Sequence, residues 1–389
     1  CCAGRGNPFT REEEAIFLLL SQLINHLLNP RKNVANVSFQ TGENPFFTTL
    51  RKRVDAYFDQ HGLSYTGNYK IISKTIVLLL ALTGLYIWLV FFTPGTVLAL
   101  ALCVLLGIVF AAIGFNVMHD GAHGSYSDHK MVNEIMGFSL NLLGGDVQLW
   151  KVKHNMIHHS FTNIEGLDDD INIQPFMRTN TNQKRLKGHR YQHWYFAFLY
   201  MLTYLSWVFI DDFKKYFSGK IGETRFRKFK THQHLIFWST KVVNLFLFLV
   251  LPMLLVGVVP AIVGYLTASL SCGLLIAVVF QLAHVVEETN FSNAYNEKRG
   301  VEDEWAVHQI RTTANFATNN KIVSWFTGGL NFQVEHHLFP RISHVYYPVI
   351  SKMVEETCRE FGIPYLKHRT VYAAVRSHVV HLKEMGQRD

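Results

Sequence analysis

Charged side chains are missing from two long stretches of this 389-residue chain. No Asp, Glu, Lys or Arg occurs between Lys74 and Asp120 or between Lys241 and Glu287, so each interval holds 45 uncharged residues. A helix crosses a bilayer with about 20 predominantly apolar residues. Each interval is therefore long enough for two crossings.

Each uncharged stretch predicts a helical hairpin. Pro and Gly place uncharged turns at 93–96 and 257–260. Lys and Arg lie at the opposite ends of the hairpins, so the positive-inside rule predicts that both termini and the segments 119–236 and 285–389 are cytoplasmic. The expected transmembrane helices lie near 71–92, 97–118, 237–258 and 262–284.

Cysteine is scarce and has no informative spacing. The chain has five Cys and no Cys-x-x-Cys, which argues against thiolate zinc sites and disulfide scaffolds and favours a reducing compartment for the catalytic face. The formal net charge is +8, but the basic residues flank the apolar stretches instead of forming one compact face. We therefore expect the lipid bilayer as a partner and no nucleic acid.

Two shorter apolar segments bear on the number of crossings. Residues 195–210 have basic residues on both sides, and residues 135–150 are interrupted by Gly144 and Gly145. Both patterns predict interfacial helices that lie flat on the membrane. The expected fold is an all-α integral membrane protein with four transmembrane helices in two hairpins, interfacial helices, and a cytoplasmic helical cap.

The chain is predicted to form one membrane domain over residues 36–385. Residues 1–35 differ from the rest: the apolar run 15–28 is short, and acidic residues precede it where a signal peptide carries positive charge. We interpret 1–35 as an N-terminal extension of uncertain role with one short helix.

Histidines cluster just outside the uncharged stretches. Residues four apart share one face of a helix, so the first two clusters can each direct two rings at one metal, and His159 turns toward a neighbouring position. An adjacent pair such as His336 and His337 projects in different directions and can serve two metals or two sites on one metal. The candidate ligands are eight imidazoles, too many for one metal and suited to two: His119, His123, His154, His158, His159, His284, His336 and His337.

Weaker interpretations remain open at this point. A single His-x-x-x-His is more often a solvated helix face than a ligand pair, and all-nitrogen sites suit Fe, Cu, Ni or Zn. Catalytic zinc needs about three protein ligands, so the count favours two iron ions.

Carboxylates and rings that can orient the ligands are Asp120, Asp168, Asp170, Glu335, His308 and His344. The histidines predicted to lie on the surface are His26, His61, His129, His189, His193, His232, His234, His368, His378 and His381.

The motifs His-Asp-Gly-Ala-His at 119–123, His-Asn-Met-Ile-His-His at 154–159 and Gln-Val-Glu-His-His at 333–337 resemble the three histidine boxes of integral-membrane fatty acid desaturases. Gln333 in the third box resembles the front-end branch, which inserts a double bond between an existing one and the carboxyl end. The segments 162–170 and 328–331 are also similar to that branch, especially to bacterial acyl-CoA or linoleoyl-CoA desaturase-like members.

The resemblance implies a four-helix membrane fold, a di-iron site on the eight histidines and O2 as co-substrate. Gln333 and Asn163 are candidates for weaker contacts near the metals. A fused haem domain with His-Pro-Gly-Gly does not occur in this sequence. The resemblance therefore implies a separate ferredoxin-type or cytochrome-type electron donor, and a location in a bacterial inner membrane.

The substrate and the outcome of the reaction stay open between alternatives. The substrate is an acyl-CoA or a phospholipid acyl chain, held in an apolar tunnel that Trp150, Trp305, Trp325 and Phe332 could line. The same ligands would serve a fatty acyl hydroxylase. A zinc-dependent membrane lipid hydrolase is a more distant alternative, since it needs about three histidines. A metal transporter or sensor is also more distant, because it would place ionisable residues inside the crossings, and the hairpins have none before His119 and His284.

Overall fold

The computed structural model describes residues 37–39, 45–222, 224–294 and 304–388. The predicted extension at 1–35 and its short helix lie outside these residues. The described part is mostly helical, in agreement with the predicted class, and it differs from a purely helical fold by short strand pairs.

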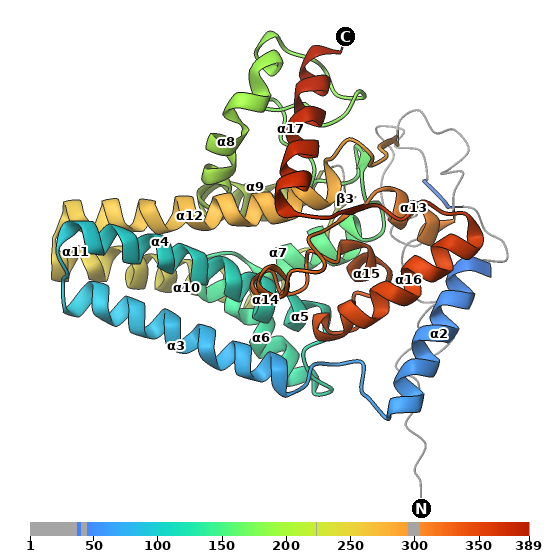
Figure 1. Ribbon diagram of the computed structural model, residues 1–389. Helices are drawn as coiled ribbons and strands as arrows, with labels where there is room; N and C mark the ends of the chain where they lie inside the picture. The colour runs from blue at the N-terminus through green and yellow to red at the C-terminus, as the bar shows by residue number, and fades with distance from the viewer. Residues whose placement is uncertain (1–36, 40–44, 223, 295–303, 389) are drawn as a thin grey trace, which may run out of the picture.

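Two helical hairpins form the long axis of the molecule (Figure 1). In the first, α3 (Tyr69–Phe91) is followed by α4 (Thr96–Ile113), which runs on through the π-helix η1 (Gly114–Met118) into α5 (His119–His123). Apolar side chains on α3 such as Leu80 (68% exposed) face outward, as expected where lipid replaces water around the helix.

The second hairpin consists of α10 (Thr231–Leu245), the π-helix η5 (Phe246–Val250), α11 (Leu251–Val256) and the long α12 (Val258–His284). Only Gly257 separates α11 from α12, and its φ of 96° lies in the region that favours glycine. The turn is thus shorter than predicted, and α12 begins four residues before 262.

A fifth helix is long and apolar enough to cross a membrane: Lys187–Ser218, built from η3 (Lys187–Tyr191), α8 (Gln192–Ser206), η4 (Trp207–Asp211) and α9 (Asp212–Ser218). Figure 1 shows α8 steeply inclined to the two hairpins. It crosses α12 at Gly273, where a Cβ atom would clash with Met201 O. The structure thus has five candidate spans, where the sequence predicts four.

The segment 135–150, which we predicted to lie at the interface, is interrupted at the two glycines. Helix α6 (Lys130–Leu142) ends before the two glycines, and α7 (Val147–Lys151) begins after Asp146, whose side chain accepts from Gln148 N and Leu149 N. The π-helix η2 (Val152–His158) follows without a break and carries the second histidine cluster.

Six two-residue strands form three pairs among the described residues. They are β1 (Ile164–Glu165) with β4 (Ser292–Asn293), β2 (Lys220–Ile221) with β3 (Thr224–Arg225), and β5 (Asn315–Phe316) with β6 (Lys367–His368). The first and third pairs are parallel and join loops far apart in the chain.

The C-terminal part contains six helices among its described residues: α13 (Trp305–Arg311), α14 (Lys321–Phe326), α15 (Gln333–Leu338), η6 (His344–Tyr346), α16 (Tyr347–Phe361) and α17 (Val371–Gln387). The third histidine cluster lies on α15, which packs against α13 and α16, whereas α17 packs against α8. Helix α2 (Pro45–His61) packs on α16 through a core that contains Leu50, Val54 and Ile350. The same core includes Val334 and Leu338 of α15, and so fixes the helix that carries His336 and His337.

Candidate metal centre

The first histidine cluster sits at the end of the first hairpin, and the second lies on a π-helix. His119 and His123 are one turn apart on α5, directly after η1. His154 and His158 belong to η2. Such wider turns often occur at functional sites, and hydropathy alone did not predict them.

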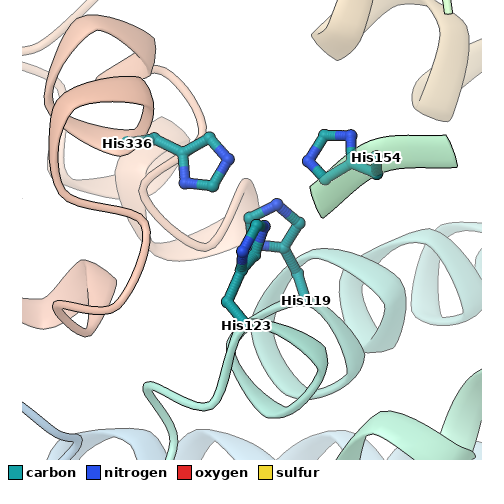
Figure 2. A group of neighbouring side chains, drawn as sticks. All are labelled: His119, His123, His154 and His336. Carbon is teal, nitrogen blue, oxygen red and sulfur yellow. The ribbon is translucent and has the colours of Figure 1, made fainter. Parts of the chain in front are cut away.

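The eight histidine rings converge from four parts of the chain. Ligand atoms of His119, His123, His154 and His336 all lie within 4.8 Å of one another (Figure 2), and those of His158, His284 and His337 form a second such group. His159 lies between the groups, with ring centroids 4.9 Å from His123 and 4.5 Å from His337.

This grouping refines the predicted ligand pairing. His336 and His337 belong to different groups. His154 and His158, predicted to share one metal, lie in different all-histidine groups, although both also form a third group with Asp170. The π-helix brings the two rings into a stacked arrangement with centroids 5.1 Å apart.

Most of these rings leave one nitrogen buried without a hydrogen-bond partner. This holds for the Nε2 atoms of His123, His154, His158, His159, His284, His336 and His337, and for Nδ1 of His159. Buried polar atoms in proteins are nearly always hydrogen-bonded. Eight imidazole nitrogens in one place that have no hydrogen-bond partner among the described residues therefore fit bound metal ions as their missing partners.

The opposite nitrogen of several rings has a fixed partner. His158 Nδ1 lies 2.9 Å from Asp168 Oδ2, and His154 Nδ1 lies 3.3 Å from Asp170 Oδ2. A hydrogen bond of this kind orients a ring and makes its other nitrogen a better ligand. The contacts that we predicted for these two carboxylates are thus confirmed.

Three further partners of the rings were missed in the sequence. Gln309 Oε1 lies 2.8 Å from His337 Nδ1, Tyr347 Oη lies 3.2 Å from His336 Nδ1, and Thr312 O lies 3.3 Å from His284 Nδ1. None of the three stands in a histidine motif. Lys153 was also missed; its ammonium is paired with Asp170.

Burial and neighbouring charge set the protonation of the rings outside the membrane-spanning helices. Burial lowers the pKa of His154 to about 4, and it holds the pKa of His336 and His337 well below the usual range. These rings are neutral near pH 7, as metal ligands must be. Burial also disfavours the charged form of His158, but the Asp168 carboxylate outweighs it and raises the pKa of that ring.

The other predicted supporting residues hold the scaffold around the site. Asp120 accepts from Ser343 Oγ at 2.7 Å, and Glu335 accepts from Asn315 Nδ2 and from Tyr365 Oη. These hydrogen bonds go to residues other than the eight histidines, whereas we predicted contacts with the ligand rings for both carboxylates. Burial raises the pKa of Glu335 to about 7.

The remaining polar candidates lie close to the ligands. Asn163, at φ 56°, donates through Nδ2 to His284 O, and His308 Nε2 lies 2.8 Å from Thr162 O. Gln333 is buried, and its Oε1 atom has no hydrogen-bond partner among the described residues.

Three histidines predicted to lie on the surface are buried: His189, His378 and His381. His378 lies 2.9 Å from Tyr200 Oη and 2.6 Å from Val285 O, so it joins α17 to α8 and to the end of α12. The surface prediction was wrong for these residues because helix packing, which spacing does not reveal, covers them. His26 lies outside the described residues.

Aromatic rings wall the histidine groups. Trp150 stacks on His154 with centroids 4.4 Å apart, and Trp305 Nε1 donates to His159 O. Phe280, which we did not predict near the site, has its ring centroid 5.1 Å from that of His158 and 4.9 Å from that of His284. Phe332 belongs to the core between α2 and α16 instead.

An apolar cavity of about 410 Å³ lies between the two hairpins, near their turns. Its lining includes Pro94, Phe110 and Pro260 and none of the eight histidines. Phe110 is nine residues before His119, roughly 13 Å along a helix. The histidine rings therefore do not line this cavity.

Known proteins are similar to this chain over most of its length. The fatty acid desaturase family model matches residues 94–369. An sn-1 linoleoyl-lipid 6-desaturase of Synechocystis is 35% identical and covers 89% of this chain and 97% of its own length. The corresponding enzyme of Arthrospira platensis is also 35% identical, covering 88% of this chain and 92% of itself.

A moss protein extends the comparison. An acyl-lipid (8-3)-desaturase of Physcomitrium patens is 35% identical and covers 90% of this chain and 74% of its own length. The predicted resemblance is confirmed by these matches. The chain therefore belongs to the fatty acid desaturase family, and it is an oxidoreductase that acts on fatty acyl chains.

Proposed function

We propose that this desaturase introduces a cis double bond into an acyl chain of a membrane lipid, between an existing double bond and the carboxyl end. The observation that carries the proposal is the pair of buried histidine groups with unpartnered Nε2 atoms. The names of the relatives favour an acyl lipid over an acyl-CoA as substrate, and a linoleoyl group as the chain that is modified.

We assign two iron ions to the histidine groups, with His119, His123, His154 and His336 around one, His158, His284 and His337 around the other, and His159 between them. Bound iron would supply, with O2 as co-substrate, the oxidising power that an unactivated alkyl C–H bond requires and that no side chain offers.

The chain's own groups orient the ligands and exclude water. Asp168, Asp170 and Gln309 hold ring nitrogens on the side away from the metals. Trp150 and Phe280 cover the faces of the rings with apolar surface. A dry site protects a reactive oxidant from side reactions with solvent.

Four membrane crossings agree best with the geometry of the site. His158 and His337 lie in contact, with centroids 4.9 Å apart, so the chain between them must cross the membrane an even number of times. The second hairpin accounts for two crossings. We therefore propose that Lys187–Ser218 lies at the interface although its length would allow a crossing.

The distribution of Lys and Arg supports a cytoplasmic location for the histidine groups and for the helices that surround them. We propose that residues 36–385 act as one domain in a bacterial inner membrane. Electrons would come from a separate carrier of the ferredoxin or cytochrome type.

Expression in a host of known lipid composition tests the proposal. We expect new fatty acids with an additional double bond on the carboxyl side of an existing one, found first in membrane lipids. The matched variants are His158→Ala, which removes a ligand, and His129→Ala, which changes an exposed ring. The first is expected to abolish the product and the second to retain it.

Other products would point to the alternatives. A hydroxy fatty acid as the main product would identify a hydroxylase. Lipid cleavage that continues without O2, by protein that contains zinc and no iron, would identify a hydrolase. Either result would contradict the proposed function.

A further inference from the structure

We propose that Lys74 is a positioning residue for the first histidine pair and holds the segment 116–120 through two arms, one to Asn116 and one through His344 to Asp120. This inference rests on the proposed metal site. It extends that site into the first transmembrane helix, more than 40 residues before the first histidine motif.

Lys74 lies near the start of α3 but does not face lipid or water. It is 9% exposed, and Asn116, Asp120 and His344 around it are 4% exposed or less. An ammonium group buried in this way costs several kcal/mol unless it is paired and hydrogen-bonded. Its partners must therefore compensate a large desolvation cost, which makes their positions well defined.

The first arm fixes the π-helix that precedes His119. Lys74 Nζ donates to Asn116 Oδ1 at 2.9 Å, and Asn116 Nδ2 donates to Ala112 O and to Phe326 O, both at 2.9 Å. Asn116 belongs to η1, three residues before the ligand. Both the oxygen and the nitrogen of the Asn116 side-chain amide are thus hydrogen-bonded, and these bonds hold the wide turn of η1 in place.

The second arm reaches the residue that follows His119. Lys74 Nζ lies 3.0 Å from His344 Nε2. Because an ammonium group only donates, this nitrogen accepts, and the ring proton is on Nδ1. His344 Nδ1 lies 3.0 Å from Asp120 Oδ2, a charge contact that is not aligned as a hydrogen bond. Ser343 Oγ and His344 N donate to the same oxygen.

The Lys74 ammonium and the Asp120 carboxylate therefore lie on opposite sides of the His344 ring. The network joins α3, η1, α5 and η6, and it reaches α14 because Lys74 Nζ donates to Trp325 O at 3.2 Å. Four segments that are distant in sequence thus meet at this network: α3, the continuous pair η1 and α5, α14, and η6.

Two glycines let the loop after α14 pack closely against η1 and His344. Gly328 (φ 58°) and Gly329 (φ 71°) have backbone conformations that favour glycine. A Cβ atom at Gly328 would clash with Phe115 O, and one at Gly329 would lie 2.8 Å from the Cβ of His344. The two glycines of the segment 328–331, which resembles the family motif, thus allow close packing at this network.

Metal retention by the purified full-length protein tests the role of Lys74. Protein loaded with Fe²⁺ is dialysed against a chelator series, and iron per protein is measured beside the melting temperature. We expect Lys74→Met to weaken retention of one of two iron equivalents by roughly 10–100-fold, the usual range for residues behind a metal ligand. Lys70→Met is the matched control, because Lys70 is exposed one turn earlier on the same helix.

A double-mutant cycle with His344→Leu separates positioning from general stability. If both residues act in one network, the loss in the double variant is smaller than the product of the two single losses. If Lys74→Met cannot be recovered folded, Asn116→Leu replaces it in the same cycle.

Two results would overturn the inference. The first is that the losses of iron retention in the two single variants multiply in the double variant. The second is that Lys74→Met lowers the melting temperature but retains as much iron as Lys70→Met. If the unmodified protein itself bound no iron, the proposed function would fail instead, and Lys74 would lose its assigned role with it.

Discussion

The hydrogen bond between Asp168 and His158 allows a quantitative prediction. The Asp168 side chain is fully buried, and its Oδ2 atom lies 2.9 Å from both His158 Nδ1 and Asn163 N. Asp168→Asn keeps the volume of the side chain but replaces the charged acceptor with a neutral amide. A hydrogen bond to a charged group contributes about 1.5–3 kcal/mol.

Loss of that contribution predicts weaker metal binding by about 10–100-fold, since 1.4 kcal/mol corresponds to a factor of ten. The group of His158, His284 and His337 is the one affected. Iron per protein after dialysis against chelators of rising affinity measures this change directly, without dependence on turnover. We expect one equivalent to be lost from the variant at a chelator strength that leaves both in the unmodified protein.

The neighbouring carboxylate provides the control. Asp169 pairs with Lys215 at 3.2 Å and is partly exposed, so Asp169→Asn removes a charge one residue away without touching a histidine. The desaturation rate is expected to fall in parallel with iron for Asp168→Asn and to stay unchanged for Asp169→Asn. Full retention of both iron equivalents by Asp168→Asn would refute the view that this carboxylate strengthens the ligand.

Further predictions concern the ligands, the metal and the scaffold. Chelation is expected to abolish desaturation by the unmodified enzyme, with recovery on addition of Fe²⁺ and none with Zn²⁺, as measured by product analysis. His336→Ala is expected to remove the product completely, whereas His378→Ala, which loses two buried hydrogen bonds, lowers the melting temperature but leaves measurable activity in folded protein. Leu50→Ala, fully buried between α2 and α16, is expected to destabilise the protein by about 2–5 kcal/mol in a thermal unfolding assay without altering double-bond position.

Much of the membrane architecture follows from the distribution of charge in the sequence. The absence of charged residues over two intervals locates both hairpins, because a bilayer tolerates few charges along a spanning helix. Histidine spacing then identifies the rings that come together. These features are local patterns of one or two residue types, and such patterns are what periodicity reveals.

Contacts between distant segments could not be predicted in the same way. Gln309, Tyr347 and Lys74 acquire their roles only when the loops after α12 fold back over the first hairpin. Lys74 was interpreted from its position as one of the basic residues that flank the membrane, which is correct for its place in the chain. Its burial depends on partners up to 270 residues away.

The length of the fifth apolar helix illustrates a different limit. Residues 195–210 alone appear too short to span, but the helix in the structure extends to Lys187–Ser218 because polar ends continue it. The length of an apolar run therefore underestimates the length of a helix whose polar ends continue beyond that run. The two π-helices beside the histidines are equally invisible to hydropathy, since a single extra residue per turn changes no composition.

The adjacent histidines of α15 have a consequence for how the enzyme is assembled. His336 and His337 belong to different groups, yet they share one six-residue helix whose backbone is anchored by Val334 N to Asn315 Oδ1. The core between α2 and α16 holds this helix through Val334 and Leu338, so both histidine groups depend on the same packing. A substitution that shifts the backbone of α15 is therefore expected to alter both groups at once, whereas a substitution behind a single ring alters one.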